Sequence, residues 1–271
     1  MLEKITPVIL TYNEAANIDR TLKNLTWATQ IIIVDSNSTD DTLKILQRYP
    51  QVKIFQRDFD THAKQWNYAL EKVESEWVLS LDADYLVRYQ LLEEIESLSD
   101  IDSIDGYSIS FKYCVWGHPL RGTLLPPRIC LFKKNKAVYV DDGHTQVLRV
   151  EGRCERLSSD IYHDDRKPLS RWIWAQDRYM VLEAKKLRET PASQLSRADR
   201  IRKYKILAPW LVLVYCLILK GGIFDGSPGW YYALQRVFAE TLLSLRLIEA
   251  EYFKGDRHSS HKEYEDLADN G

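Results

Sequence analysis

Two aspartates, Asp82 and Asp84, stand one residue apart directly after the apolar run Trp77-Val78-Leu79-Ser80-Leu81. Two carboxylates at the end of a buried strand would form a small site rich in oxygen ligands. Mg²⁺ and Mn²⁺ prefer such ligands and keep coordination positions for water and substrate phosphates. Asp-x-Asp alone is weak evidence, because aspartates also cap turns and helices. The strands and helices around the motif therefore determine whether it is a metal site or a turn.

The first hundred residues alternate between strand-like and helix-like segments. Expected strands cover residues 5–10, 31–34, 52–55 and 77–81, and expected helices cover 15–25, a segment after a Ser38 or Thr39 cap, 63–73 and 90–98. This alternation predicts right-handed βαβ units and a parallel sheet, whose ligands bind at the carboxyl ends of the strands. Those ends carry Thr11-Tyr12-Asn13-Glu14, Asp35-Ser36-Asn37-Ser38 and Asp82-Ala83-Asp84, so we expect them to share one site.

No glycine-rich phosphate loop follows the first strand. The turn at residues 10–14 lacks both G-x-G-x-x-G and GxxxxGK[ST], which argues against a dinucleotide-binding or P-loop protein. A nucleotide would then be held by side chains. Asp35 could accept hydrogen bonds from a base or ribose, Asn13 offers both a donor and an acceptor, and the two aspartates could hold a cation that bridges a diphosphate.

Composition bounds the broader class of protein. The chain of 271 residues can form one large domain or one domain with an elaborated second half. Its net charge of -2 gives no reason to expect nucleic-acid binding. Four widely spaced cysteines indicate structural thiols in a reducing compartment. No signal-peptide pattern follows Met1, so we expect cytoplasmic residence.

The second half follows a different pattern. Strand-like segments cover residues 107–115 and 129–132, and helical periodicity covers 171–187 and 237–253. Residues 206–219 are almost wholly apolar but fall short of the roughly 20 residues that span a bilayer. Arg200, Lys203 and Lys205 precede them. Two interpretations stay open: a buried helix, or a segment on a membrane surface that carries anionic lipid.

Three motifs, in this order and spacing, resemble the inverting family 2 glycosyltransferases: Pro7-Val8-Ile9-Leu10-Thr11-Tyr12-Asn13-Glu14, Ile33-Val34-Asp35-Ser36-Asn37-Ser38-Thr39-Asp40 and Leu81-Asp82-Ala83-Asp84. More loosely, His163 leading into residues 171–184, and Gly221-Gly222-Ile223-Phe224-Asp225-Gly226, resemble bacterial lipopolysaccharide-core β-glucosyltransferases. The resemblance implies an α/β GT-A nucleotide-diphospho-sugar transferase fold: a mostly parallel central sheet flanked by helices, with a helical C-terminal extension.

The resemblance also implies a division of the chain. Residues 1–100 would form the nucleotide-sugar-binding half, and residues 101–190 the acceptor-binding and catalytic half of the same domain. Residues 191–253 would form a helical region that could associate with a membrane, and residues 254–271 a polar tail.

Site residues carry over from the family by position. The residues that would contact the base and ribose are Thr11, Asn13, Glu14 and Asp35, and the start of the helix that closes over the nucleotide supplies Lys64, Gln65 and Asn67. Asp82 and Asp84 match the motif for Mg²⁺ or Mn²⁺, with Asp84 as the usual direct ligand, and His163 is a further candidate ligand. The alternatives are helix capping for Asn13-Glu14 and a solvated helix face for Lys64 and Asn67.

Inverting transfer requires a base that deprotonates the acceptor hydroxyl. The segment Val140-Asp141-Asp142-Gly143-His144-Thr145-Gln146 offers Asp142 first, then Asp141, then His144. Related core transferases tend to have His-Glu where this chain has His144-Thr145. Asp-Asp-Gly is also a common turn sequence, so a purely structural role is the alternative.

The expected function is transfer of a sugar from a nucleotide-sugar, UDP-linked by preference, to a saccharide or lipid-linked acceptor in cell-envelope polysaccharide or lipopolysaccharide synthesis. The expected location is the cytoplasmic face of the inner membrane, with peripheral membrane contact. A polyprenyl-phosphate glycosyltransferase is the alternative within this chemistry. Two alternatives belong to other classes. A nucleotidyltransferase would need a glycine-rich first loop, which this chain lacks. A non-catalytic nucleotide-sugar-binding protein would not need the aspartates Asp35, Asp82 and Asp84, which are all present.

Overall fold

The computed structural model describes residues 1–98, 102–142 and 145–252. The chain divides into two compact units, Met1–Arg166 and Lys167–Gly271. The first unit contains the sheet and all the described residues predicted for the nucleotide and metal site. The second unit is helical.

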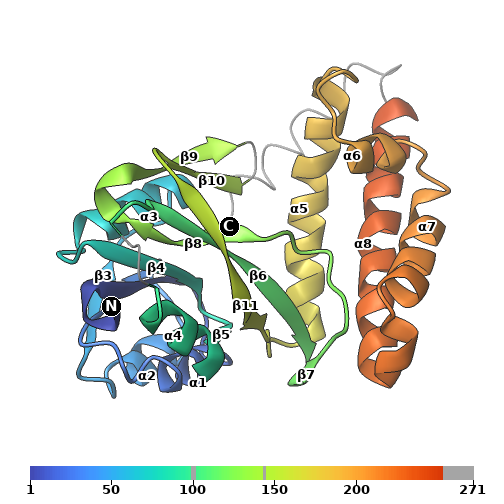
Figure 1. Ribbon diagram of the computed structural model, residues 1–271. Coiled ribbons are helices and arrows are strands. Elements are labelled where there is room, and N and C mark those ends of the chain that lie inside the picture. Colours follow the sequence, from blue (N-terminus) through green and yellow to red (C-terminus); the bar gives the residue numbers. More distant parts are fainter. Residues whose placement is uncertain (99–101, 143–144, 253–271) are drawn as a thin grey trace. The chain divides into compact units, whose positions relative to one another are not determined.

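The first unit is built on one mixed sheet. Its strands are β1 (Ile5–Thr11), β2 (Ile31–Asp35), β3 (Val52–Gln56), β4 (Trp77–Asp82), β5 (Tyr85–Val87), β6 (Gly106–Val115), β7 (His118–Pro119), β8 (Arg128–Lys133) and β11 (Cys154–His163). Within the described ranges their order is β3-β2-β1-β4-β8-β6-β11-β5, with β7 paired to β6 (Figure 1). β3, β2, β1 and β4 are parallel, as the sequence predicts, and β8 runs antiparallel between β4 and β6.

Helices cover both faces of this sheet. They are η1 (Leu2–Lys4), α1 (Ile18–Lys23), α2 (Thr42–Leu46), α3 (His62–Glu71), α4 (Tyr89–Glu96) and η2 (Lys134–Lys136). α1, α2 and α4 pack into one core cluster and α3 into the other (Figure 1). β2 is buried along its whole length because both faces are covered, which explains its unbroken apolar run. α1 is shorter than the predicted helix over residues 15–25, because polar contacts hold its approach in a turn.

A separate hairpin packs against α3. It consists of β9 (Ala137–Asp142) and β10 (Thr145–Val150), which pair only with each other in the described ranges. Asn67 Nδ2 donates to the Tyr139 carbonyl at 2.8 Å, and the Tyr139 N–H donates to Asn67 Oδ1 at 2.9 Å. The Trp66 ring stacks on the Tyr139 ring at 5.1 Å. α3 therefore fixes the position of β9, at whose end the candidate bases lie.

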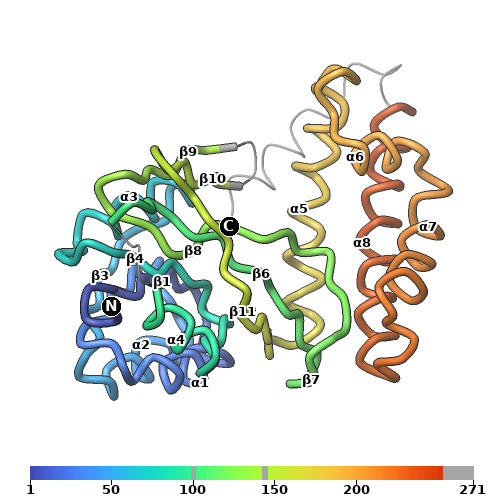
Figure 2. Tube along the Cα trace, in the orientation of Figure 1, coloured from blue at the N-terminus to red at the C-terminus, as the bar shows by residue number. Residues whose placement is uncertain are grey.

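The second unit contains α5 (Leu169–Glu189), α6 (Arg197–Arg202), α7 (Ala208–Val214), η3 (Tyr215–Leu219), η4 (Gly222–Asp225) and α8 (Gly226–Tyr252) (Figure 2). The sequence analysis grouped α5 with residues 101–190. In the structure α5 belongs with the C-terminal helices, because Trp172 packs against Phe238 at 5.9 Å and Asp177 pairs with Arg246 at 2.8 Å. α8 begins earlier than the predicted residue 237. Pro228 fits its first turn, where the missing N–H costs nothing.

The apolar segment at residues 206–219 is only partly buried: Ala208, Cys216 and Leu217 are buried, but many of its large side chains are exposed. Ile206 is 75% exposed, Trp210 67% and Leu219 71%. Among the described residues, no single helix is both long and apolar enough to cross a bilayer. Residues Ala208–Leu219 and Gly222–Tyr252, bent by 69°, meet that length and composition requirement only as a pair.

Candidate functional site

The loops that follow β1 and β2 are bonded to each other. Asn13, in the left-handed region at φ 55°, donates its N–H to Ser38 Oγ at 2.9 Å, and its Oδ1 accepts from the Thr39 N–H at 2.8 Å. The Glu14 N–H donates to Thr42 Oγ1 at 2.7 Å. Asn13 and Glu14 thus join the loop after β1 to the segment after β2. These bonds bring the first two predicted nucleotide-contacting segments together.

Asp35 lies beneath these loops. Its carboxylate is fully buried and accepts hydrogen bonds from Thr11 Oγ1 at 2.7 Å, Ser38 Oγ at 2.6 Å and the Ser38 N–H at 2.8 Å. A buried carboxylate needs such partners, because desolvating its charge without them is costly. In this arrangement Asp35 organises the floor of the site. Contact of Asp35 or Thr11 with a base or ribose stays a prediction.

The three predicted residues of α3 face different surroundings. Lys64 is exposed and pairs with Asp60 at 2.5 Å, a contact that contributes little in solvent. Gln65 is 1% exposed and donates from Nε2 to Ser36 Oγ at 3.0 Å, which ties α3 to the loop after β2. Asn67 binds the backbone of β9, as described above. Lys64 is therefore the one of these three that offers an exposed side chain to a nucleotide.

The turn with Asp82 and Asp84 is held by its backbone. Thr21 Oγ1, from α1, donates to the Ala83 carbonyl at 2.6 Å, and the Asp164 N–H, at the end of β11, donates to the Asp84 carbonyl at 3.0 Å. The Asp82 side chain is exposed, and that of Asp84 is 14% exposed. The motif thus sits on rigid elements at the carboxyl end of β4, as predicted.

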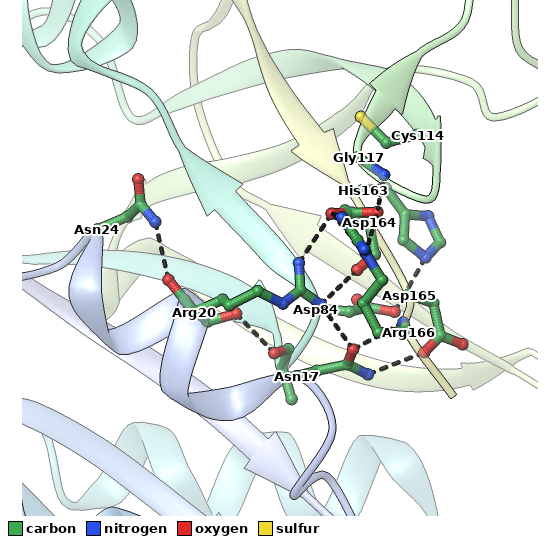
Figure 3. Close-up of polar contacts among 12 residues, drawn as sticks. Asn17, Arg20, Asn24, Asp84, Cys114, Gly117, His163, Asp164, Asp165 and Arg166 are labelled. Carbon is green, nitrogen blue, oxygen red and sulfur yellow. Dashed lines mark hydrogen bonds and ion pairs between the residues drawn. The ribbon is translucent and has the colours of Figure 1, made fainter. Parts of the chain in front are cut away.

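Asp164 is the buried centre of the cluster in Figure 3. Its side chain is 3% exposed and pairs with Arg20 and Arg166, each at 2.8 Å, and the Gly117 N–H donates to it at 3.1 Å. At Gly117, with φ +83°, an added Cβ would lie 2.6 Å from the guanidinium of Arg166. Arg166 is therefore committed to Asp164.

His163 faces the metal motif. Its Nε2 lies 3.0 Å from Asp84 Oδ2, and its ring meets the edges of Tyr85 and Tyr113 at centroid distances of 5.3 and 4.8 Å. Burial alone would lower the pKa of His163, but the Asp84 carboxylate, assisted by Asp82 and Asp165, raises it above the usual value. The Nε2 contact engages one oxygen of Asp84, and Nδ1 has no hydrogen-bond partner in the described ranges.

The donor set at this turn fits a divalent cation that shares its coordination with a ligand. Among the described residues, no group of three or more His, Cys, Asp or Glu is arranged to hold a metal by itself. Two carboxylates on one rigid turn, one of them exposed, suit Mg²⁺ or Mn²⁺, which complete their shells with water and phosphate oxygens. The protein residues that would hold the cation are Asp84 and Asp82, with His163 adjacent to Asp84.

The candidate bases lie at the end of the hairpin. Asp141 Oδ2 accepts from Thr61 Oγ1 at 3.3 Å, so this residue rests against the start of α3. The side chain of Asp142, and the whole of His144, lie outside the described residues. Their predicted roles are therefore untested.

One histidine escaped the sequence analysis. His62, the first residue of α3, is exposed although much protein surrounds it, and this desolvation lowers its pKa. Asp82 and Asp141 both act on its ring and raise that pKa. Asp82, at the metal motif, and Asp141, at the end of β9, thus both lie near enough to His62 to influence its charge. Its sequence signal was only a histidine next to the helix cap Thr61.

The sequence of residues 6–151 matches the family model described as glycosyl transferase family 2. That range contains the loops after β1 and β2 and the motif of Asp82 and Asp84. The chain belongs to glycosyl transferase family 2.

Among curated relatives, this family 2 chain is 29% identical over 256 residues to the lipopolysaccharide core biosynthesis glycosyltransferase LpsC of Rhizobium meliloti, which covers 91% of this chain and 92% of LpsC. It is 33% identical over 107 residues to an uncharacterized glycosyltransferase of Rickettsia felis. That match covers 39% of this chain and spans 38% of the length of the Rickettsia protein.

The fold also resembles a solved structure. S. aureus TarS 1–349, in a crystal structure with UDP-GlcNAc, superposes with a TM-score of 0.50 at 18% identity, over 93% of this chain and 92% of that one. At this identity the likeness concerns the fold alone. It confirms the predicted fold class, a GT-A sheet with flanking helices and a helical C-terminal extension.

We predict that Asp164→Asn lowers the free energy of unfolding by about 3 kcal/mol or more, because it leaves Arg20 and Arg166 facing each other without a buried counter-charge. Urea denaturation measures this. The matched control is Asp160→Asn, on the same strand, which makes no side-chain ion pair in the described ranges and should stay within about 0.5 kcal/mol of the wild type. Equal stability of the two variants would contradict a central role for Asp164.

Proposed function

We propose that this chain transfers a sugar from a UDP-sugar, with inversion at the anomeric carbon, to a saccharide or lipid-linked acceptor of the cell envelope. The observation that carries the proposal is the clamped turn of Asp82 and Asp84, beside the bonded loops after β1 and β2. Family membership supports glycosyl transfer, and the relative LpsC supports a lipopolysaccharide-type acceptor.

The donor site is assigned from the chemistry of each segment. The nucleoside would lie over the loops built on Asn13 and Asp35, with Lys64 at its edge, and the diphosphate would lie towards Asp82 and Asp84. A bound Mg²⁺ or Mn²⁺ supplies positive charge that stabilises the departing diphosphate. The backbone bonds at Ala83 and Asp84 hold the two carboxylates in place before the donor arrives.

We predict that a UDP-sugar with Mn²⁺ raises the melting temperature of the wild type, since a ligand that binds only the folded state stabilises it by mass action. The shift should vanish in Asp84→Ala and persist in the control Asp160→Asn. In the same preparations the wild type should release UDP slowly by hydrolysis without acceptor. Failure to bind or hydrolyse any UDP-sugar would overturn the proposal, and binding without any UDP release would favour a non-catalytic binding protein.

The transfer step needs one proton acceptor. The acceptor oxygen forms a bond to the anomeric carbon, the bond from that carbon to the diphosphate oxygen breaks with its electron pair leaving on UDP, and the hydroxyl proton moves to a carboxylate. We assign this base to Asp142, with Asp141 and His144 next. Support comes from the position of Asp141 against Thr61, and from His62, on which both Asp82 and Asp141 act.

We predict that Asp142→Asn lowers kcat by about 100-fold to 10,000-fold, the usual contribution of a general base, while the dissociation constant for the donor is unchanged. Single-turnover kinetics and calorimetric titration with UDP measure the two quantities. Asp141→Asn is the comparison variant and should retain more activity. Near-wild-type turnover by Asp142→Asn with normal donor binding would refute the assignment.

The helical unit supports acceptor delivery from a membrane. The strongly exposed apolar side chains of α7, η3 and η4 include Trp210, Leu219 and Phe224 at 67%, 71% and 73%. The basic residues Arg200 and Lys203, also exposed, lie just before them. Exposed apolar side chains that follow basic residues in the chain suit the interface of an anionic bilayer. We propose peripheral contact with the cytoplasmic face of the inner membrane.

We predict that the protein sediments with vesicles of phosphatidylethanolamine and phosphatidylglycerol. The variant Trp210→Ser/Phe224→Ser should bind at least about tenfold more weakly, because it removes two large apolar side chains from the interface. The control is Tyr89→Ser, which changes an equally exposed aromatic residue of the first unit. Unchanged binding of the double variant would contradict this contact. A polyprenyl phosphate that accepts sugar better than any saccharide would favour the alternative acceptor.

A further inference from the structure

We infer that Arg128 is a phosphate-binding residue of this site and contacts the donor diphosphate beside the Asp82-Ala83-Asp84 turn. The inference rests on the proposed function, since it names a further residue for the same donor. The first observation is strand register. In the antiparallel pair of β4 and β8, Trp77 lies opposite Lys133 and Leu79 opposite Leu131. Arg128 lies three residues beyond Leu131, in the direction in which β4 runs towards Asp82.

The two strands stay together beyond their last paired residues. Ser80 Oγ donates to the Cys130 carbonyl at 3.3 Å, one step nearer to the aspartate motif than the pair Leu79 and Leu131. Arg128, at the start of β8, thus arrives at the edge of the sheet where β4 ends.

An irregularity in β8 accompanies this approach. The neighbouring β6 residues Tyr107 and Ser108 pair with Leu131 and Ile129, so Cys130 is an extra residue in β8. A bulge of this kind bends a strand and redirects the side chains next to it, and bulges are frequent beside active sites. The bulge lies two residues from Arg128.

The electrostatic surroundings agree with the register. Burial is the main cause of the raised pKa values of three residues, Tyr85, Cys130 and Tyr139. In each case the charge of Asp82 raises the pKa further, and the charge of Arg128 lowers it. These residues come from three strands, β5, β8 and β9. Arg128 and Asp82 are therefore both close enough to influence the same three side chains.

Arg128 is also available for a ligand. The other cations around the site are engaged: Arg20 and Arg166 bind Asp164, Lys64 binds Asp60, and Arg57 donates to the Lys64 carbonyl. The Arg128 side chain is exposed, and within the described ranges its guanidinium makes no hydrogen bond or ion pair. A planar guanidinium forms paired hydrogen bonds with phosphate oxygens, so an unengaged arginine here suits a diphosphate.

The charge of the reaction explains why such a residue is needed. Asp82 and Asp84 already place negative charge at the turn, and a diphosphate adds more. When the bond to the anomeric carbon breaks, the leaving UDP gains a further negative charge. A cation near Asp82 would attract the bound diphosphate and stabilise the charge that develops on it.

The test compares UDP with uridine, which lacks the diphosphate. Titration calorimetry with Mn²⁺ present should show that Arg128→Gln weakens UDP binding by about 10-fold to 100-fold, the range for hydrogen bonds to a charged group. Uridine should bind Arg128→Gln as it binds the wild type. Arg128→Lys keeps the charge but not the paired geometry, so its affinity for UDP should lie between those of the wild type and Arg128→Gln. The control Arg149→Gln removes an exposed arginine of β10 and should bind UDP normally.

Two results would overturn the inference. One is wild-type affinity of Arg128→Gln for UDP. The other is an equal loss of affinity for UDP and uridine, which would mean that the substitution changes the shape of the pocket. The first result, combined with a raised KM for the acceptor, would place Arg128 on the acceptor instead. If the wild type itself does not bind UDP, the proposed function fails instead.

Discussion

The backbone of one turn determines whether this site can exist. Two carboxylates one residue apart repel each other, and an ordered loop costs conformational entropy. Here Thr21 and the Asp164 N–H bind the carbonyls of Ala83 and Asp84, so the turn is fixed by a helix on one side and a strand end on the other. Asp164 is fixed in turn by Arg20 and Arg166. The placement of Asp82 and Asp84 depends on this buried ion cluster.

Some polar residues near the site hold the protein in place, and others are exposed to a ligand. Asp164, Arg166 and Asn67 are polar residues near the site whose hydrogen-bonding groups are taken up by the protein. Asp82 is exposed, Asp84 is partly exposed beside His163, and Arg128 has no side-chain partner among the described residues. The site therefore combines two carboxylates that require a cation with an arginine that requires an anion. A metal-bound diphosphate meets both requirements at once.

Much of the fold could be predicted because short stretches of sequence indicate its strands and helices. Apolar runs of strand length alternating with helical periodicity define β1 to β4 and place three polar segments at one edge of the sheet. Long-range contacts have no such signature. The bond between Asn67 and Tyr139 joins residues 72 positions apart, and Arg20 meets Asp164 across 144. Nothing in either segment alone indicates the partner.

The candidate site shows the same division. The Asp-x-Asp motif was visible because of the strand before it, whereas Arg128 follows two prolines and becomes significant only through its register with β4. Asp35 was predicted from its position at a strand end, but its complete burial depends on Thr11 and Ser38. The exposure of residues 206–219 likewise follows from how α7 and η3 pack, which hydropathy alone does not determine.

The most direct measurement is a crystal structure of this protein with UDP and Mn²⁺, with the metal located by its anomalous scattering. We expect one Mn²⁺ peak next to a carboxylate oxygen of Asp84 and the diphosphate, with the uridine over the loops of Asn13 and Asp35. A metal or diphosphate bound elsewhere, away from Asp82 and Asp84, would contradict the proposed donor site.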